Sequence, residues 1–354
     1  MAAGQNRVAI LLGASALESR IIEIGPSYAP VAPKAAGWHT HVVDHVDQTR
    51  LRIKYQDAGV PVDRIEPVDS IWDRGQLDQA VPEALHGRFD RLIASHVIEH
   101  LPDPAGFLNA AARLLKPESE IALAVPDKRF CFDYFRTPST TGEMIEAYFC
   151  RRSSPAPRDL WNQLAYSVTA DEALAWPPGV TATPRLMAEF SQLKALLPSF
   201  APSAPALHDD CHIWRFTPAG FTLVLFELGQ LGIIDWHLHR LEYLGGFEFF
   251  AILRRGVPEL PDMAAVASHR LDLLGRQQRE QYEHVELAKA AERPFRSQAP
   301  GPDDAAALFA QLEQQGRRLT ELEQVLARLH GPLARAARVL RKLGLRRRTH
   351  GSGP

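Results

Sequence analysis

The sequence predicts an α/β protein in which a doubly wound, mostly parallel sheet is followed by a helical tail. Three observations support this fold class. Short β-rich runs alternate with longer helical patterns from Arg20 to Val125, two further β-rich runs lie close together near residue 250, and from Pro258 onward the composition shifts to Ala, Leu, Gln, Glu and Arg. Strands that alternate with helices are typical of βαβ units and a parallel sheet.

The expected parallel strands are short, apolar and partly β-branched, as strands covered on both faces should be. They are residues 20–24, 39–43, 64–68, 89–94 and 120–125. Helical spacing between them predicts helices over residues 48–58, 76–85 and 105–115. The last of these should end at Lys116-Pro117, because proline cannot continue a helix.

The stretch from Pro126 to Trp214 is rich in Pro, Ser and aromatic residues and shows no sustained period, which predicts an irregular insertion covering the active site. Thr217-Pro218 then forms a typical N-cap and first helical residue. Strands over 232–240 and 247–253 follow so closely that they should pair as an antiparallel hairpin. We therefore expect one domain over residues 1–257, with its insertion at 126–214.

Residues 258–350 are expected to form a separate helical tail. Leucines from Leu308 to Leu343 recur at alternating steps of four and three, the a/d spacing of a coiled coil, which predicts a homodimer. The segment from Arg335 to Arg348 is a basic amphipathic helix. Two interpretations of it stay open: peripheral contact with an anionic membrane, or the solvated face of the coiled coil. It lacks interleaved aromatic residues, so we expect no nucleic-acid partner.

Charge and cysteine content exclude other classes of protein. Lys and Arg number 40 against 42 Asp and Glu, and a net charge of -2 gives the whole chain no attraction to nucleic acid. The widely spaced Cys131, Cys150 and Cys211 fit neither a disulfide framework nor a zinc module. The apolar run before Gly13 is too short for a signal peptide, and no window reaches the roughly 18 apolar residues of a membrane span. We expect a cytoplasmic protein, peripheral on the inner face of the membrane if the tail binds lipid.

The first candidate site is the loop after the first expected strand, which reads Glu23-Ile-Gly-Pro-Ser-Tyr-Ala29. Gly25 lets the backbone approach a ligand, and a carboxylate at Asp44, on the tip of the next strand, can accept both hydrogen bonds of a ribose diol. Ser27 and Ala29 stand where a G-x-G-x-G loop has glycines. An ordinary strand-to-helix turn is therefore the alternative.

Five motifs together resemble class I S-adenosylmethionine-dependent methyltransferases over roughly residues 18–255: those at 22–28, 42–45, 89–104, 115–117 and 216–218. The resemblance implies a Rossmann-like sheet of seven strands with an antiparallel last strand, and S-adenosyl-L-methionine as the cofactor. It also implies where parts of the cofactor bind: the methionine moiety at Glu23 and Gly25 with neighbouring Pro26 and Ser27, the ribose at Asp44 with neighbouring His45, the adenine near Asp69, and the sulfonium above Ser95 and His96.

Methyl transfer to a hydroxyl needs an acceptor oxygen held in line with the methyl group and a base that takes its proton. Three residues are candidates for the base, since each is expected at the carboxyl ends of the strands: His100, Asp127 and His212. A turn-capping role is the alternative for each. The segment from Val125 to Asp133 resembles methyltransferases found with bacterial polysaccharide-synthesis enzymes, which implies O-methylation of a saccharide or glycan intermediate.

Two other functions stay open. His96-Val-Ile-Glu-His100 matches the H-x-x-E-H pattern of zinc hydrolases, yet Pro102 and Pro104 interrupt the helix that such a site requires. The cluster His208-Asp-Asp-Cys-His212 is also rich in potential ligands, but hydrogen-bonding roles are commoner for loop histidines, so we expect no metal. The other alternative is a non-catalytic coiled-coil scaffold with a degenerate methyltransferase domain.

Overall fold

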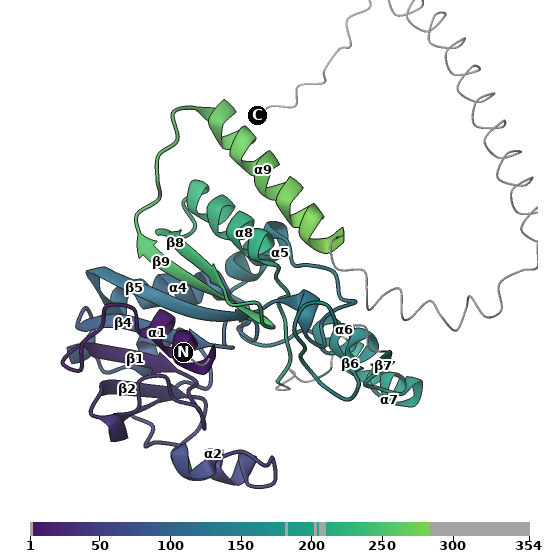
Figure 1. Cartoon of the computed structure of the whole chain (residues 1–354), viewed down its shortest axis with the longest axis horizontal. Coiled ribbons are helices and arrows are strands. Elements are labelled where there is room, and N and C mark those ends of the chain that lie inside the picture. Colours follow the sequence, from purple (N-terminus) through teal and green to yellow (C-terminus); the bar gives the residue numbers. More distant parts are fainter. Residues whose placement is uncertain (1–2, 181–182, 202–203, 205–209, 283–354) are drawn as a thin grey trace, which may run out of the picture. The chain divides into compact units, whose positions relative to one another are not determined.

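The computed structural model describes residues 3–180, 183–201, 204 and 210–282. Within these residues a seven-stranded sheet consists of β1 (Arg20–Ile24), β2 (His39–Asp44), β3 (Ser70–Ile71), β4 (Phe89–Ser95), β5 (Leu115–Pro126), β8 (Trp236–Tyr243) and β9 (Glu248–Arg255). The strand order is β3-β2-β1-β4-β5-β9-β8 (Figure 1). The strands from β3 to β5 in this order are parallel, whereas β9 runs antiparallel to both β5 and β8. The predicted Rossmann-like sheet with an antiparallel last strand is confirmed.

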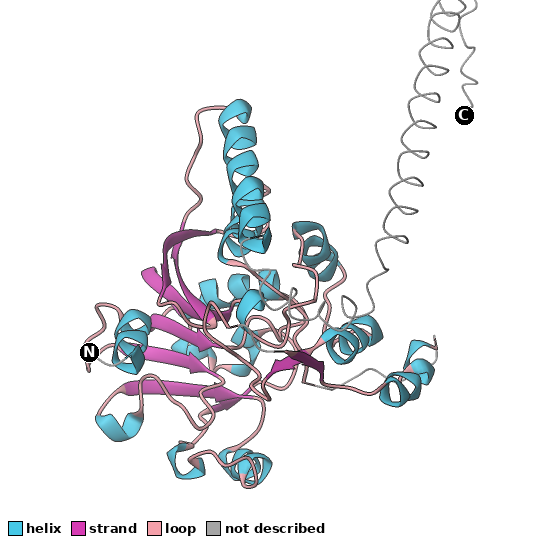
Figure 2. Ribbon diagram, turned by 45° about the vertical axis from the view of Figure 1, so that its right-hand side comes forward, coloured by secondary structure: helices cyan, strands magenta, loops and turns pink. Residues whose placement is uncertain are grey.

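Helices lie on both faces of this sheet (Figure 2). The α-helices in the described residues are α1 (Ala3–Leu12), α2 (Gln48–Tyr55), α3 (Leu77–Ala80), α4 (Pro104–Leu114), α5 (Thr141–Phe149), α6 (Pro157–Tyr166), α7 (Phe190–Ala195), α8 (Pro218–Gln230) and α9 (Met263–Tyr282). Successive strand residues point to opposite faces. Ile21 accordingly packs with Ile10 and Leu11 of α1, while Ile22 belongs to the larger core that includes α4 and α8. Burial on both faces explains the nearly continuous apolar runs of the strands.

The two longest core helices after β4 begin with the same local signal. Asp103 and Thr217 each precede a proline in the first helical turn, and their side-chain oxygens accept hydrogen bonds from the backbone N–H of Gly106 and Gly220. Such caps satisfy one of the N–H groups that a helix start leaves free and contribute about 1 kcal/mol. The predicted N-cap at Thr217 is thus confirmed.

The third strand lies beyond the position that the sequence analysis predicts. Residues 65–68 form no strand, and β3 begins at Ser70. Pro67 accounts for the difference, because proline has no N–H to donate to a neighbouring strand. Pro82 similarly divides the helix expected over 76–85 into α3 and a 3₁₀ turn, η3 (Glu83–Leu85).

The segment expected as an irregular insertion contains short regular elements. They are the helices α5, α6 and α7, the 3₁₀ turns η4 (Lys128–Phe130) and η5 (Leu197–Phe200), and the antiparallel pair β6 (Val168–Ala170) and β7 (Pro184–Leu186). Each is too brief to produce a sustained hydrophobic period. Two further 3₁₀ turns, η1 (Lys34–Ala36) and η2 (Val62–Arg64), lie between the first strands. The limits of the insertion and of the domain remain predictions.

Helix α9 lies along α8 (Figure 1). Arg270 Nε is 2.6 Å from Glu227 Oε1, and the ring centroids of His269 and Phe226 are 4.5 Å apart.

The expected coiled coil from Leu308 and the basic segment from Arg335 lie outside the described residues. None of the helices in the described part of the chain has both the length and the apolar character that crossing a membrane requires.

Candidate active site

A cavity of about 1410 Å³ opens at the carboxyl ends of β1, β2 and β4. The chain places β2 on one side of β1 and β4 on the other, and open α/β sheets bind ligands at such a switch point. Nine of the twelve site residues predicted from the sequence line this cavity: Glu23, Gly25, Pro26, Ser27, Asp44, His45, Ser95, His96 and His100. Asp69, Asp127 and His212 do not line it.

The loop after β1 turns sharply at Gly25. Its φ of 62° lies in the left-handed region, and its N–H donates to the carbonyl of Val43 at 2.8 Å. A Cβ added to Gly25 would lie 3.2 Å from Cγ2 of Val97, so backbone conformation and close packing both favour glycine here. Ser27 also has a positive φ, of 49°, and its buried hydroxyl has no hydrogen-bond partner among the described residues. The loop therefore keeps a left-handed turn although a serine replaces one of the glycines.

Glu23 anchors this loop from the end of β1. Its carboxylate accepts hydrogen bonds from the N–H of Val31 at 2.6 Å and of Ala32 at 3.1 Å. Burial of the side chain outweighs these bonds and raises the pKa of Glu23 to about 7. Through these hydrogen bonds Glu23 positions the loop beside the cavity.

Asp44 lies at the end of β2 and is 5% exposed. Its Oδ2 is buried and has no hydrogen-bond partner in the described residues. Such an atom is unfavourable unless something pairs with it, and a ribose hydroxyl is a donor of suitable size. The side chain therefore fits the cofactor role that the sequence resemblance implies for it.

Asp69 does not line the cavity and forms an ion pair with Lys34. Its Oδ2 is 2.6 Å from Lys34 Nζ and accepts the N–H of Val42 at 2.7 Å. Because β3 is displaced, the acidic residue that follows this strand into the cavity is Asp73. The sequence analysis did not predict Asp73 as a site residue. Pro67 was the available signal, because it argues against a strand at 64–68 and favours a later one.

Ser95 and His96 close the base of the cavity. Arg7 of α1 contacts both the hydroxyl of Ser95 and the carboxylate of Glu248. His96 has a φ of 54°, and its Nε2 is 2.9 Å from Glu248 Oε2. Burial opposes the charged ring, but its hydrogen bond with Glu248 and the nearby negative charge of Glu99 raise the pKa of His96 to about 9. Arg7 and Glu248 were not predicted, because their contact joins residues 241 positions apart.

The three candidate bases lie in different environments. His100 lines the cavity, and its Nδ1 is 2.8 Å from Asp210 Oδ1. Asp127 is 0% exposed, and Arg129 donates to both of its carboxylate oxygens. His212 is buried behind the cavity wall, with Nδ1 2.5 Å from Asp133. Among the three, His100 alone has access to the cavity.

The H-x-x-E-H motif does not form the ligand-bearing helix of a zinc hydrolase. Residues 98–100 form a turn, and the ring of His96 contacts Glu248. In the second ligand-rich cluster, His208 and Asp209 lie outside the described residues.

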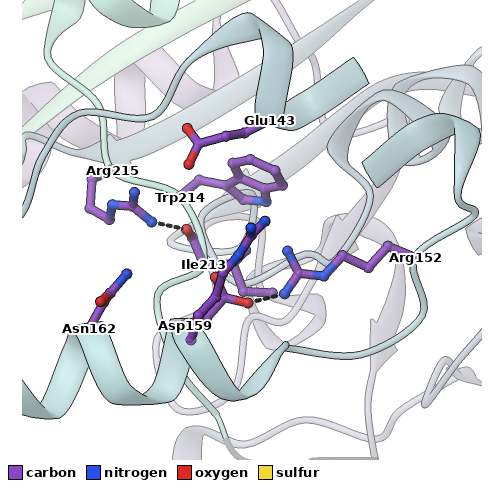
Figure 3. Close-up of a pocket in the computed structure, with 8 residues that line it drawn as sticks. Glu143, Arg152, Asp159, Asn162, Ile213, Trp214 and Arg215 are labelled. Atoms are coloured by element: carbon purple, nitrogen blue, oxygen red, sulfur yellow. Dashed lines mark hydrogen bonds and ion pairs between the residues drawn. The ribbon is translucent and has the colours of Figure 1, made fainter. Parts of the chain in front are cut away.

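A separate pocket of about 80 Å³ lies between α5, α6 and residues 213–215 (Figure 3). Arg152 pairs there with Asp159, and Arg215 donates to the carbonyl of Ile213. None of the predicted site residues lines this pocket. Ligand pockets usually measure about 300–1,000 Å³, so it is too small for the cofactor.

Residues 5–178 match a family model described as a methyltransferase domain. No curated protein matches the sequence. Among similar solved structures is 1,6-didemethyltoxoflavin-N1-methyltransferase from Burkholderia thailandensis, with 12% identity and a TM-score of 0.36 over 72% of this chain and 79% of that one. Another is a SAM-dependent methyltransferase from Methanosarcina mazei, with 12% identity and a TM-score of 0.34 over 73% of this chain and 99% of that one. These scores are low, so the assignment rests on the family match. The chain carries a class I S-adenosylmethionine-dependent methyltransferase domain, and the protein is a methyltransferase.

Proposed function

We propose that the protein methylates an oxygen atom of a small hydroxylated acceptor, of the saccharide or glycan-intermediate class. The observation that carries this proposal is the size and composition of the main cavity. At about 1410 Å³ it exceeds the usual 300–1,000 Å³ of a single-ligand pocket. It therefore has room for the cofactor and for a second molecule.

The cavity is lined by groups that suit the cofactor and by groups that suit an acceptor. For the cofactor it has the left-handed turn at Gly25 and an oxygen of Asp44 without a partner in the described residues. The segment after β5 adds Arg151, Ser153 and Asp210 to the lining. Charged and hydroxyl-bearing side chains of this kind suit a polyhydroxylated acceptor, in agreement with the resemblance of residues 125–133 to polysaccharide-associated methyltransferases.

S-adenosylmethionine supplies an electrophilic methyl group when bound. The protein has to hold the acceptor oxygen in line with that group and assist the loss of its proton. His100 is our candidate for the base that assists this proton loss, because among the three candidates it alone lines the cavity. Its ring is oriented by Asp210 at 2.8 Å. Arg7 and His96, which also line the cavity, are both hydrogen-bonded to Glu248.

An acceptor screen with methyl-labelled S-adenosylmethionine tests the proposal. Neutral sugars, sugar nucleotides and glycan fragments are compared with amines of similar size, and products are identified by mass and by acid stability. We expect label in methyl ethers of the hydroxylated compounds. Transfer to the amines alone, by protein that binds S-adenosylhomocysteine, would refute O-methylation.

The non-catalytic scaffold predicts a different result in the same screen. A degenerate domain would fail to bind S-adenosylhomocysteine in calorimetry and would transfer no label to any acceptor. The intact left-handed loop and the free oxygen of Asp44 favour a working cofactor site instead.

A further inference from the structure

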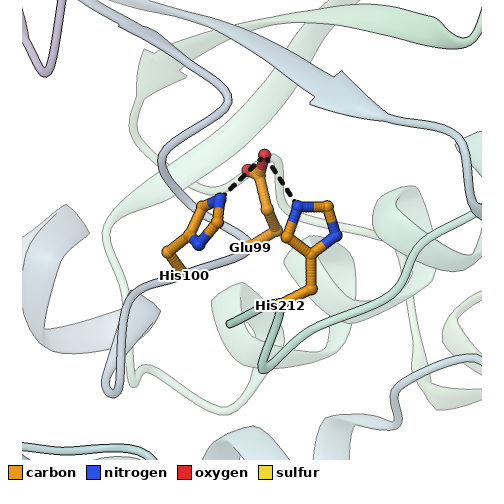
Figure 4. A group of neighbouring side chains, drawn as sticks. All are labelled: Glu99, His100 and His212. Atoms are coloured by element: carbon orange, nitrogen blue, oxygen red, sulfur yellow. Dashed lines mark ion pairs between the residues drawn. The ribbon is translucent and has the colours of Figure 1, made fainter. Parts of the chain in front are cut away.

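The turn after β4 and the segment before α8 bring three potential metal ligands together: Glu99, His100 and His212 (Figure 4). One ligand atom of each lies within 4.8 Å of the others. Oε1 of Glu99 is 3.8 Å from Nε2 of His100 and 3.9 Å from Nε2 of His212. Both rings thus direct a nitrogen toward the same carboxylate.

The buried carboxylate of Glu99 lies close to three histidine rings but forms no direct hydrogen bond with a described residue. The residue is 1% exposed, and neither oxygen has a hydrogen-bond partner in the described residues. The two distances to His100 and His212 are too long for hydrogen bonds. His96 Nδ1 is nearer, at 3.5 Å, but this contact lies at the limit of a weak hydrogen bond. These rings stabilise the buried charge from a distance, and a divalent ion between Glu99, His100 and His212 would add the direct bonds that are absent.

Both histidine rings are oriented from behind by carboxylates. Asp210 lies 2.8 Å from Nδ1 of His100, and Asp133 lies 2.5 Å from Nδ1 of His212. Histidines that bind metals commonly use their second ring nitrogen in this way, which fixes the tautomer and leaves Nε2 with its lone pair for the metal. The arrangement is repeated on both sides of Glu99.

Hydrogen bonds to the backbone fix the positions of Glu99 and His212. The carbonyl of Glu99 accepts the N–H of Ile213 at 2.8 Å and of Trp214 at 3.0 Å. Arg136 donates to the carbonyl of His212 at 2.8 Å and pairs with Asp133 at 2.5 Å. The chain segments carrying Glu99 and His212 are therefore fixed against each other, which lowers the cost of assembling a site.

From these contacts we infer that Glu99, His100 and His212 form a binding site for a divalent transition-metal ion, with zinc as the best match. Zinc bonds to histidine nitrogen and carboxylate oxygen are about 2.0–2.2 Å long, so tetrahedral ligand atoms are separated by about 3.4 Å. The gaps from Glu99 to the two histidines, 3.8 and 3.9 Å, need a small contraction, and the gap between the histidines, which is within 4.8 Å, can need a larger one. Magnesium and calcium prefer oxygen ligands and suit the two imidazoles poorly. This site departs from the sequence-based expectation of no metal.

The ion would act in the proposed function through the cavity that His100 lines, and this use rests on that function. A hydroxyl oxygen bound to a divalent ion has a lowered pKa. His100 would then be a metal ligand and not the base: the acceptor oxygen releases its proton to water and forms its bond to the methyl carbon as the carbon–sulfur bond breaks, which leaves a neutral thioether. Metal binding itself is independent of the acceptor.

Zinc titration of the full-length, untagged and chelator-stripped protein tests the site against a competing chromophoric chelator. We expect one equivalent to bind tightly to the parent, and cobalt in its place to give the visible absorption of a tetrahedral complex. His100→Ala should abolish this binding while the cofactor analogue S-adenosylhomocysteine still binds. Asp210→Asn, which removes the carboxylate behind the ring but no metal ligand, should weaken zinc binding about 10–100-fold.

His237→Ala is the matched control, because His237 lies on β8 and contacts the carbonyl of Gly256. It should bind zinc like the parent. Glu99→Gln is compared by thermal unfolding as well, since a buried substitution can disturb the fold. Equal zinc binding by the parent and His100→Ala, or no binding by the parent, would overturn the inference. Zinc binding without methyl transfer to hydroxyls would leave the site standing and refute the proposed acceptor.

Discussion

His45 contacts Asp44 twice, and both contacts use the same carboxylate oxygen. The backbone N–H of His45 donates to Oδ1 of Asp44 at 2.8 Å, and its ring Nδ1 lies 2.6 Å from that oxygen. The carboxylate is thereby fixed with Oδ2 buried and unpaired. A fixed acceptor at the end of β2 needs no reorganisation to bind a ribose hydroxyl.

Asp44→Ala should weaken the binding of S-adenosylmethionine strongly and leave the fold intact. A hydrogen bond to a charged group contributes roughly 1.5–3 kcal/mol, so loss of one lowers affinity about 10–100-fold. Calorimetry with S-adenosylhomocysteine measures the effect, and thermal unfolding checks the fold. His45→Ala is the milder comparison, because it frees Asp44 without removing the acceptor. Parent-like affinity in Asp44→Ala would show that the ribose binds elsewhere.

Gly25→Ala should lower both stability and cofactor affinity. A left-handed backbone costs a non-glycine residue about 1–2 kcal/mol, and the added Cβ would press on Val97 at 3.2 Å. Gly87 is a matched control, since its φ is 66° and nothing lies within 4 Å of an added Cβ. Gly87→Ala should therefore lose stability alone. Equal loss of affinity in both variants would mean that the loop at Gly25 does not contact the cofactor.

Glu23 should make the protein less stable as the pH rises from about 4.5 to 7. The folded chain holds this proton more tightly, because burial raises the pKa of Glu23 from 4.5 to about 7. Below pH 4.5 the protonated side chain contributes its full stabilisation to the folded protein. This contribution, about 3 kcal/mol of unfolding free energy, is lost as the pH rises through about 7. Urea unfolding across this range should show a shallower pH dependence for Glu23→Gln than for the parent. Glu18→Gln, at an exposed position, should show the same pH dependence of stability as the parent. If Glu23→Gln also shows the parent's pH dependence, the pKa of the buried carboxyl is not raised.

Most strands and the cofactor loop could be predicted because their signals are local. An apolar run indicates a strand that is buried on both faces of a sheet, and a glycine after such a run indicates a turn. The contacts of His96 with Glu248 and of Glu99 with Ile213 join residues more than 100 positions apart, and no periodicity encodes such pairs. The sequence therefore predicted His96, His100 and His212 as important residues but not their neighbours. The third strand lies beyond its predicted position because Pro67 interrupts the apolar run at 64–68.

Leu273→Ala should destabilise the protein through loss of packing by α9. Leu273 is 0% exposed, and the helix that carries it is tied to α8 by the pairing of Arg270 with Glu227. Truncation of a buried leucine to alanine typically costs 2–5 kcal/mol. Leu274, the next residue, is 44% exposed, and its truncation should change stability by no more than about 0.5 kcal/mol. Urea unfolding of the two full-length variants compares a buried and an exposed position of one helix. A large difference would make α9 part of the folded methyltransferase domain and move the expected boundary at residue 257 beyond it. Equal stabilities would mean that α9 separates from α8 in solution, as expected for an independent tail.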